Sequence, residues 1–328
     1  MNTQQKPLHS GFHAASTSTE VMAGIDLQGK TAVVTGGYAG IGLETTRSLV
    51  AAGCRVLVPA RDLAKARTNL NGLANVTIAP MELTDPDSID AFATGLKGPL
   101  HLLINNAGIM WVGLQRDARG YESHFSTNHL GHFQLTRRLW PALLQANGAR
   151  VINVSSWGHR FSPVVFEDWN FERRAYDPMA AYGQSKTANN LFTLELDRRG
   201  QTEGIRSFSL HPGAIVDTDL KRHAPAELLH TTGVYDAQGK AVRDPARGLK
   251  TIEQGAATTL WCATSPRLEG LGGLYCDNCD VAPLVLPDGE NEFKTAEVAR
   301  ITGVMPHSID PQAAARLWDL SEQLTRDR

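Results

Sequence analysis

The chain has 328 residues, enough for one large domain or two small ones, and an ordinary globular composition of 42% hydrophobic and 20% charged residues. Its formal net charge of −2 argues against a general attraction to nucleic acid or to an acidic membrane surface. No apolar run approaches the length of a membrane span, and the polar residues 1–24 lack the apolar core of a signal peptide, so we expect a cytoplasmic protein.

Strand-like and helix-like segments alternate along the chain after residue 24. The predicted strands are short apolar runs at 31–35, 55–60, 76–81, 101–108, 149–156 and 205–213. Helical patterns separate them, at 43–53, 62–73, 85–96, 119–146 and a segment that contains Tyr182 and Lys186. Asp62 and Asp85 are placed to cap two of these helices, the second with Pro86 at its first position. This alternation predicts an α/β fold, with βαβ units, a doubly wound parallel sheet and helices on both faces.

Two stretches of the chain do not fit simple βα units. Residues 157–178 are rich in aromatic side chains, and residues 214–250 are polar with several glycine, proline and histidine residues. Both follow the carboxyl end of a predicted strand, where ligands bind in doubly wound sheets. Because long insertions at that edge are often lids, we expect both to form a substrate lid, and surface excursions without a function are the alternative.

The sequence TGGYAGIG places Gly36, Gly40 and Gly42 between the first predicted strand and the helix that follows. Such a turn lets backbone N–H groups and the amino end of the helix face a pyrophosphate with no side chain in the way. The glycine spacing alone is a weak signal. Its position inside a βαβ unit favours a dinucleotide site over a tight turn without a ligand.

The end of the second predicted strand reads VPARD, and it bears on the choice of cofactor. A site specific for NAD carries an acidic residue near this point, which binds the 2′-hydroxyl of the ribose. Ala60 stands there instead, and the guanidinium of Arg61 suits a 2′-phosphate. Asp62 is better explained as a helix cap. The sequence therefore predicts NADP(H), and NAD(H) is the alternative if Arg61 is only a solvated residue at a helix start.

Tyr182 and Lys186 are one helical turn apart in the sequence YGQSK. A tyrosine with an ammonium fixed beside it is either an ordinary pair on a helix surface or an acid–base group. The pKa of an unperturbed tyrosine is about 10. Because a neighbouring cation favours the phenolate, we expect Lys186 to lower the pKa of Tyr182.

The cysteines and histidines suggest no competing chemistry. Cys276 and Cys279 form a CxxC pair, but no second pair completes a zinc ribbon. The pair lies where we expect a strand end and a loop, so a structural role is favoured over redox activity or metal binding. Four histidines near the other motifs show no metal-ligand spacing and are interpreted as structural or surface residues: His129, His132, His159 and His211.

Six motifs in the same order resemble those of the short-chain dehydrogenase/reductase family over residues 26–280. They are TGGYAGIG, NNAG (105–108), NHLGHF (128–133), NVSS (153–156), YGQSK (182–186) and HPG (211–213). The chain is most similar to the branch that contains retinol dehydrogenases and the WW-domain-containing oxidoreductase. The resemblance implies a Rossmann-type sheet of about seven parallel strands, a nicotinamide cofactor and oxidoreductase activity on alcohols or carbonyls.

The resemblance also implies roles for single residues. The catalytic tetrad of the family falls on Asn128, Ser156, Tyr182 and Lys186. Tyr182 is then the general acid/base, Lys186 holds the nicotinamide ribose, and Ser156 binds the substrate oxygen. Asn128 holds a water in a proton relay. The residues expected at the cofactor are Gly36, Tyr38, Gly40, Ile41, Gly42, Arg61, Glu82, Leu83, Asn105, Ala107, Gly108, Tyr182, Lys186, Pro212, Gly213 and Ile215.

Two positions depart from the pattern of the family. Glu82 stands where the family often has an aspartate at the adenine ring. Thr218 lies one residue further along than the threonine of the PG-x-x-x-T turn, so its contact with the cofactor is left open. We divide the chain into a polar extension (1–24), a dinucleotide-binding and catalytic domain (25–285), and a C-terminal extension with a terminal helix (286–328).

The sequence therefore predicts an NADP(H)-dependent alcohol dehydrogenase or carbonyl reductase. The aromatic residues of 157–178 favour an apolar small-molecule substrate, whose identity the fold and the tetrad do not specify. The alternative is a catalytically idle dinucleotide-binding sensor or scaffold with the same fold, and the complete tetrad argues against it. We expect no nucleic-acid partner, no membrane span and no metal, and leave open a homo-oligomer such as a dimer or tetramer.

Overall fold

A computed structural model of the protein describes residues 5–215, 217–223, 233–236, 238–285 and 302–326. Its centre is an eight-stranded sheet with the strand order β3-β2-β1-β4-β5-β6-β7-β8. Neighbouring strands from β3 to β7 are parallel, and β8 is antiparallel to β7. The predicted sheet of about seven parallel strands is confirmed, and the antiparallel β8 is added to its edge.

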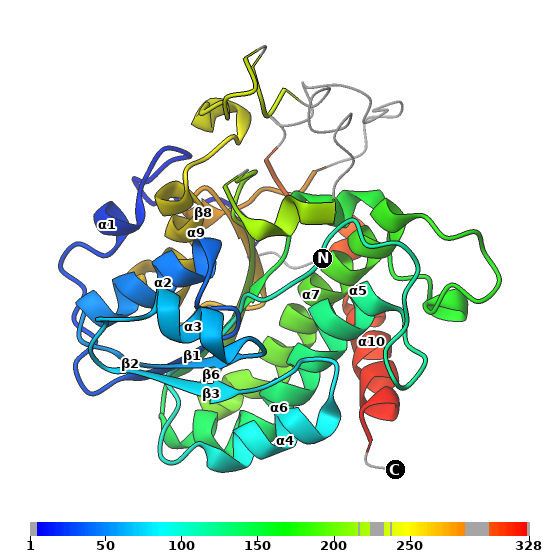
Figure 1. Ribbon diagram of the computed structural model, residues 1–328, viewed down its shortest axis with the longest axis horizontal. Coiled ribbons are helices and arrows are strands. Elements are labelled where there is room, and N and C mark those ends of the chain that lie inside the picture. The colour runs from blue at the N-terminus through cyan, green and yellow to red at the C-terminus, as the bar shows by residue number, and fades with distance from the viewer. Residues whose placement is uncertain (1–4, 216, 224–232, 237, 286–301, 327–328) are drawn as a thin grey trace.

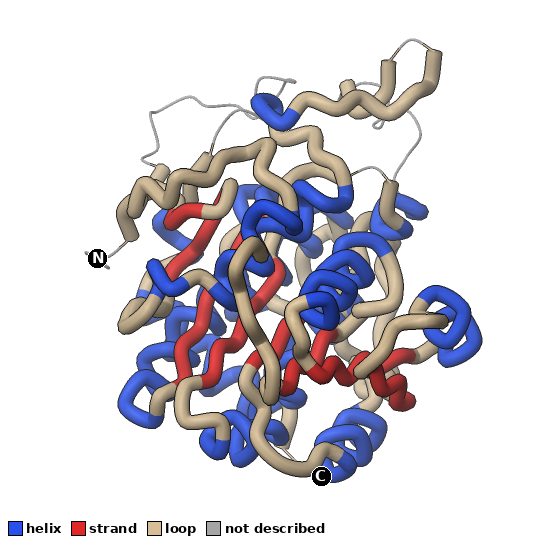
Figure 2. Tube along the Cα trace, turned by 90° about the vertical axis from the view of Figure 1, so that its left-hand side faces the viewer, coloured by secondary structure: helices blue, strands red, loops and turns tan. Residues whose placement is uncertain are grey.

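The first six strands lie within the six predicted apolar runs, and two further strands follow them in the sequence. The strands are β1 (Thr31–Val34), β2 (Arg55–Ala60), β3 (Val76–Pro80), β4 (Leu102–Asn105), β5 (Ala149–Val154), β6 (Ile205–His211), β7 (Leu274–Asp277) and β8 (Asp280–Val281). Figure 2 shows these strands running side by side between layers of helices.

The α-helices in the described part of the chain connect and flank the strands. They are α1 (Ser18–Val21), α2 (Gly40–Ala51), α3 (Leu63–Asn69), α4 (Pro86–Gly95), α5 (Ser123–Phe125), α6 (Gly131–Gln145), α7 (Pro178–Gly200), α9 (Ile252–Thr264) and α10 (Pro311–Leu324). The carboxylate of Asp62 accepts a hydrogen bond from the backbone N–H of Lys65, and that of Asp85 accepts from Asp87 and Ser88, so both predicted caps are confirmed.

The alternation of side chains along each strand builds one core on each face of the sheet. Val34 of β1 belongs to a cluster with Leu49 of α2 and Leu260 of α9. Its neighbour Val33 belongs to a cluster on the other face with Phe192 of α7. Figure 1 shows α2 and α9 on one side of the sheet and α4 and α6 on the other. The two cores fix the strand ends, and so fix the edge at which a ligand would bind.

The helix predicted over 119–146 is shorter than expected and is interrupted. It begins with α5 at Ser123, continues through a π-helical turn at Ser126–Leu130, and proceeds as α6 to Gln145. A π-helical turn inserts one extra residue into a helix and is often found at functional sites. Hydrophobic periodicity over the whole stretch does not reveal such a local insertion.

Cys276 lies in β7, and Cys279 lies in the tight hairpin turn that joins β7 to β8. This agrees with the strand end and loop predicted for the CxxC pair. Asn278 and Cys279 both have positive φ angles, of 52° and 61°, as a two-residue hairpin turn requires. Cys276 and Cys279 are buried and in no disulfide. Burial raises the pKa of Cys279 to about 12, which keeps the thiol protonated and unreactive at neutral pH and supports a structural role.

The C-terminal helix α10 packs along α7, as Figure 1 shows. Trp318 of α10 contacts Phe133 of α6 and Phe192 of α7, with ring centres 5.0 and 6.0 Å away. The insertion at 214–250 is described only in part, since residues 216, 224–232 and 237 lie outside the described residues. The lid predicted there stays a prediction.

Candidate active site

The glycine turn between β1 and α2 has room for backbone only. A Cβ atom on Gly36 would lie 3.2 Å from Cα of Ala107, and one on Gly42 would clash with the carbonyl oxygen of Gly36. Helix α2 has 12 residues, and its N-cap, Ala39, supplies no side-chain hydrogen bond. The first backbone N–H groups of α2 are therefore left without a cap from this position, as an anion-binding turn requires.

Thr35, the residue after β1, joins the glycine turn to the NNAG segment. Its hydroxyl oxygen accepts hydrogen bonds from the backbone N–H groups of Asn106 (2.9 Å) and Ala107 (3.0 Å). The same oxygen lies 2.9 Å from Nε2 of His132, whose Nδ1 lies 3.0 Å from the carbonyl oxygen of Asn128. Because a carbonyl can only accept, Nδ1 carries the proton, and the Thr35 hydroxyl donates to Nε2. Burial lowers the pKa of His132 to about 4, which keeps this neutral form.

Asn128 lies in the π-helical turn and holds the loop that follows β4. Its Nδ2 donates to the carbonyl oxygen of Ile109 (3.0 Å) and to Oγ of Ser185 (2.9 Å). Its Oδ1 accepts from the backbone N–H of Ile109 at 2.9 Å. A Cβ atom on Gly108 would lie 3.1 Å from Oδ1 of Asn128 and 3.6 Å from Nζ of Lys186. The turn thus brings Asn128, Gly108 and Lys186 together, as the motifs predict.

Tyr182 and Lys186 lie one turn apart on α7 and are 5% and 4% exposed. Nζ of Lys186 is 5.7 Å from the centre of the Tyr182 ring and donates a hydrogen bond of 2.9 Å to the carbonyl oxygen of Val154. A hydrogen bond with the Ser156 side chain lowers the pKa of Tyr182. Oγ of Ser156 also accepts from the backbone N–H of Gly158 at 3.0 Å. The structure therefore groups Ser156, Tyr182 and Lys186 at the carboxyl end of β5.

The pKa expected for Tyr182 is wrong in direction. Burial raises the pKa of Tyr182 to about 12, and the hydrogen bond with Ser156 opposes this only in part. Burial also lowers the pKa of Lys186 to about 8. Desolvation penalises the phenolate and the ammonium alike, and Nζ of Lys186 is directed at Val154 rather than at the phenol oxygen. At neutral pH, Tyr182 therefore holds its proton.

The carboxyl end of β2 presents Arg61. Its side chain is 68% exposed and forms an ion pair of 3.4 Å with Glu82. Ala60, beside it, is buried and carries no charge. Oε1 of Glu82 accepts hydrogen bonds from the backbone N–H and the hydroxyl of Thr84. A cation and one carboxylate thus stand together where the adenosine end of a dinucleotide was predicted.

The loop after β6 reaches back to the glycine turn. Gly213 has a φ of 100°, a conformation that glycine adopts without strain. A Cβ atom on Gly255 of α9 would lie 2.7 Å from Cδ1 of Ile215 and 3.0 Å from Cγ2 of Ile41, so these two isoleucines meet over α9. Thr218 lies close to Gly40, since a Cβ atom added to Gly40 would be 3.0 Å from Cγ2 of Thr218.

Comparison with known proteins shows which family has this arrangement. The model of the family described as short chain dehydrogenase matches residues 30–228. The chain belongs to the short-chain dehydrogenase family. A "Probable oxidoreductase" of Streptomyces antibioticus is 41% identical to this short-chain dehydrogenase, over 92% of this chain and 99% of that one. Retinol dehydrogenase 12 of Homo sapiens is 36% identical, over 92% and 87% of the two chains.

Solved structures agree with this assignment. An uncharacterised protein from Mycobacterium paratuberculosis matches with a TM-score of 0.69 and 31% identity, over 95% of this chain and 97% of that chain. A Pseudomonas aeruginosa protein solved as an NADP active-site complex matches with a TM-score of 0.59 and 25% identity, over 77% and 95% of the chains. The short-chain dehydrogenase is therefore an oxidoreductase of a family that uses nicotinamide dinucleotides.

The residues of this short-chain dehydrogenase fit such a dinucleotide. At Gly36 and Gly42 the turn packs so closely on Asn106 and on its own backbone that a Cβ atom would not fit, as the glycines of a dinucleotide-binding turn require. Three further residues predicted at the cofactor contact other parts of the chain. The side chain of Asn105 is buried, and its Nδ2 donates to Asn153 (2.8 Å) and Thr136 (3.2 Å). The other two are Leu83, which is buried with its carbonyl oxygen against Gly131, and Tyr38, whose carbonyl oxygen accepts from Asn69 at 2.9 Å.

The aromatic residues of 157–178 mostly pack inside the enzyme. The ring of Trp169 contacts Tyr121 and Phe125, and Phe171 is buried. Trp157 directly follows Ser156 and stacks edge-on against Phe161, with ring centres 5.2 Å apart. Of the aromatic residues that suggested an apolar substrate, this last pair is the one next to the candidate catalytic serine.

Of the four histidines near the motifs, His129, His132 and His159 are buried and His211 is half-buried. Burial lowers the pKa of His129 to about 3 and that of His159 to about 3, so both are neutral at pH 7. His159 holds Met305 and Ser156 through its two ring nitrogens. No group of three or more His, Cys, Asp or Glu side chains in the described part of the chain is arranged to bind a metal. No helix among the described residues is long and apolar enough to cross a membrane.

Proposed function

We propose that this short-chain dehydrogenase is an NADP(H)-dependent alcohol dehydrogenase or carbonyl reductase with Tyr182 as its general acid/base. The observation that carries the proposal is the group of Ser156, Tyr182 and Lys186 at the carboxyl end of β5, in which Tyr182 and Lys186 are buried and Ser156 is half-buried. A bound nicotinamide dinucleotide would supply the hydride chemistry, which protein side chains alone cannot provide.

Tyr182 holds the proton that a carbonyl oxygen requires when it is reduced. With a pKa raised to about 12 it is protonated at neutral pH, which suits a general acid in the reducing direction. Ser156, which shares a hydrogen bond with Tyr182, would bind the same substrate oxygen and orient it toward the phenol. The ammonium of Lys186 would stabilise negative charge that develops on Tyr182 after proton transfer.

Cofactor preference rests on Arg61 and Ala60. The guanidinium is exposed at the carboxyl edge, and its partner Glu82 is shared with Thr84, so the cation can turn toward a 2′-phosphate. The absence of a carboxylate at position 60 removes the usual partner of an NAD ribose. The substrate is proposed to be apolar, because Trp157 and Phe161 flank Ser156.

The proposal is tested by the variant Tyr182→Phe, with Tyr121→Phe as a matched control. Removing the phenol hydroxyl should lower kcat on the order of 10²- to 10⁴-fold, because proton transfer is lost. The dissociation constant of NADPH should change little. Tyr121 packs against Trp169 away from Ser156, so its variant should retain turnover. Retention of most of the turnover in Tyr182→Phe would contradict the assignment.

A further inference from the structure

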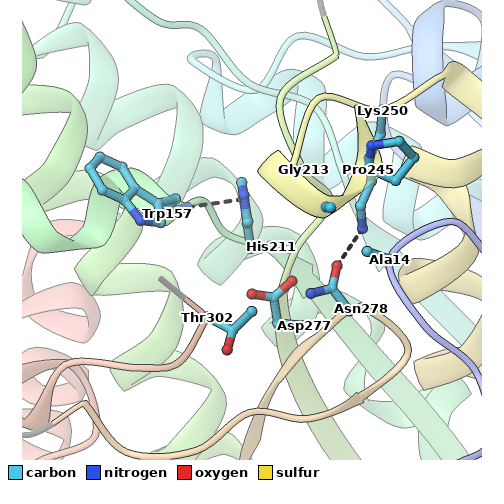
Figure 3. Close-up of a pocket in the computed structure, with 11 residues that line it drawn as sticks. Ala14, Trp157, His211, Gly213, Pro245, Lys250, Asp277, Asn278 and Thr302 are labelled. Carbon is cyan, nitrogen blue, oxygen red and sulfur yellow. Dashed lines mark hydrogen bonds between the residues drawn. The ribbon is translucent and has the colours of Figure 1, made fainter. Parts of the chain in front are cut away.

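Lys250 is buried beside the turn that follows β6, and it belongs to none of the motifs of the proposed active site. It is 2% exposed, and Nζ donates a hydrogen bond of 2.7 Å to Oδ1 of Asn278 in the β7–β8 hairpin. Figure 3 shows Lys250 extending from the segment beside Gly213 toward Asn278, with Asp277 and His211 nearby. Burial of an ammonium is unfavourable unless it is paired, so its position calls for an explanation.

The stem of Lys250 fixes the shape of the turn at Gly213. A Cβ atom on Gly213 would lie 2.6 Å from Cδ and 3.0 Å from Cγ of Lys250, so the glycine backbone packs directly on the methylene groups. The backbones are also paired, because Ala214 N–H donates to the Gly248 carbonyl (2.8 Å) and Lys250 N–H donates to the Ala214 carbonyl (3.1 Å). The turn is therefore packed against the stem of Lys250 and hydrogen-bonded to its backbone.

The same turn is tied to the loop of Ser156. The backbone N–H of Trp157 donates to Nδ1 of His211 at 3.0 Å, and His211 immediately precedes the Pro212–Gly213 turn. A cavity of about 50 Å³ separates these groups, lined in part by Trp157, His211, Gly213, Lys250, Asp277 and Asn278. The turn is thus held from one side by His211 and from the other by Lys250 and Asn278.

We propose that Lys250, fixed by Asn278, is a positioning residue that holds the Pro212–Ile215 turn in the shape that binds the nicotinamide half of the cofactor. This inference rests on the proposed function and on the family resemblance, which implies that the PG turn contacts the nicotinamide. The adenosine half would lie at Arg61, on the far side of β1 in the sheet order. Loss of the Lys250 contact should therefore weaken binding of a whole dinucleotide and leave binding of an adenosine fragment unchanged.

The test compares NADP⁺ with 2′,5′-ADP, which lacks the nicotinamide, by calorimetric titration of each variant. Lys250→Met keeps most of the stem and removes the ammonium, and Asn278→Gly removes the acceptor at a φ of 52° that glycine tolerates. Either change should weaken NADP⁺ binding about ten-fold, the effect of leaving about one molecule in ten with the turn in its binding-competent shape, and leave 2′,5′-ADP within about two-fold. Asn278→Asp keeps an acceptor oxygen for Lys250, so this variant should bind NADP⁺ as tightly as the parent does.

The matched control is Asn75→Gly, the same substitution at an exposed turn residue with a φ of 59°. It should leave both affinities unchanged. Equal weakening of both ligands, or no change in either, would overturn the role of Lys250, because a general loss of structure does not discriminate between the two halves. Failure of the unmodified protein to bind either ligand would instead refute the proposed function, on which this inference depends.

Discussion

The glycine turn of residues 35–42 and helix α7 meet at one site, but they are built in opposite ways. The turn works through backbone, and a Cβ atom at Gly36 or Gly42 would obstruct it. Helix α7 works through side chains, and its residues from Ala181 to Thr193 are all buried although many are polar. An added side-chain atom should therefore disrupt the turn, whereas the removal or protonation of a buried group should disrupt the α7 region.

The largest expected effect is a loss of folding stability at low pH, which arises from the buried histidines around α7. His129, His132 and His159 pack around α7, and burial lowers the pKa values of these three imidazoles to about 3, 4 and 3. A histidine with a depressed folded-state pKa contributes stability that is present above its unfolded pKa of about 6.5 and is lost as the pH falls. At pH 5 each should have lost about 2 kcal/mol of the free energy of unfolding, or about 6 kcal/mol in total.

Urea unfolding at pH 7 and pH 5 measures this loss. The variant His129→Gln should reduce the loss by about 2 kcal/mol, because one proton-binding group is removed from the unfolded chain. His13 is exposed, and His13→Gln should leave the pH dependence as it is. Equal stability of the unmodified protein at the two pH values would contradict the picture of buried neutral histidines.

Lys186→Met separates function from stability in α7. Turnover should fall about a hundred-fold or more, because the cation beside Tyr182 is lost. Burial lowers the pKa of Lys186 from 10.5 to about 8, so the folded protein loses about 3 kcal/mol by keeping it charged. The variant should therefore be as resistant to urea as the parent, or more so. A less active variant that is also clearly less stable would show that Lys186 is needed mainly for packing.

Gly42→Ala tests the turn by adding one methyl group. The new Cβ atom would clash with the Gly36 carbonyl oxygen and lie 2.5 Å from Nδ2 of Asn106. The turn must then shift, at a cost of about 1–3 kcal/mol, and the affinity for NADPH should fall about ten- to a hundred-fold. Gly95→Ala at the end of α4 is the control, because no atom lies within 4 Å of its new Cβ. Titration of both variants with NADPH measures the two dissociation constants. An unchanged affinity in Gly42→Ala would mean that the cofactor does not bind at this turn.

The smallest expected effect concerns the choice between the two nicotinamide cofactors. A charge-assisted hydrogen bond from Arg61 to a 2′-phosphate is worth about 1.5–3 kcal/mol, so kcat/KM with NADPH should exceed that with NADH about ten- to a hundred-fold. The exposure of Arg61 and its ion pair with Glu82 place the ratio toward the lower end. The double change Ala60→Asp with Arg61→Ile should move the preference toward NADH. A parent enzyme that uses NADH equally well would leave Arg61 without a role in cofactor choice.

The two regions also differ in how far the sequence predicted them. The glycine turn could be predicted from residue type and spacing, because its geometry depends on backbone and on the absence of side chains. The motifs placed Tyr182, Lys186, Ser156 and Asn128 together. The structure groups the first three at the carboxyl end of β5 and on α7, and Asn128 approaches Lys186 across Gly108 from the π-helical turn. The local sequence pattern is therefore sufficient to predict the glycine turn and the grouping of the catalytic residues.

What the sequence did not predict depends on burial and on contacts between distant segments. The raised pKa of Tyr182 arises because burial outweighs the hydrogen bond with Ser156, and burial cannot be read from the spacing of two residues. The hydrogen-bonded link from Thr35 through His132 to Asn128 depends on a contact between Thr35 and His132, which are 97 positions apart in the sequence. Lys250 ends the polar stretch 214–250, where no residue was assigned to the core from the sequence, and it is buried against Gly213.

The central claim is that this protein catalyses a reaction and does not merely bind a dinucleotide. The most direct test follows absorbance at the NADPH band while the unmodified protein is mixed with a panel of apolar ketones and aldehydes. NADPH binding is measured by titration on the same preparation. We predict that NADPH binds, that at least one carbonyl compound is reduced with equal consumption of NADPH, and that the rate falls as the pH rises toward the pKa of Tyr182, about 12. Tight binding of NADPH with no consumption by any compound would contradict the account and indicate an idle sensor.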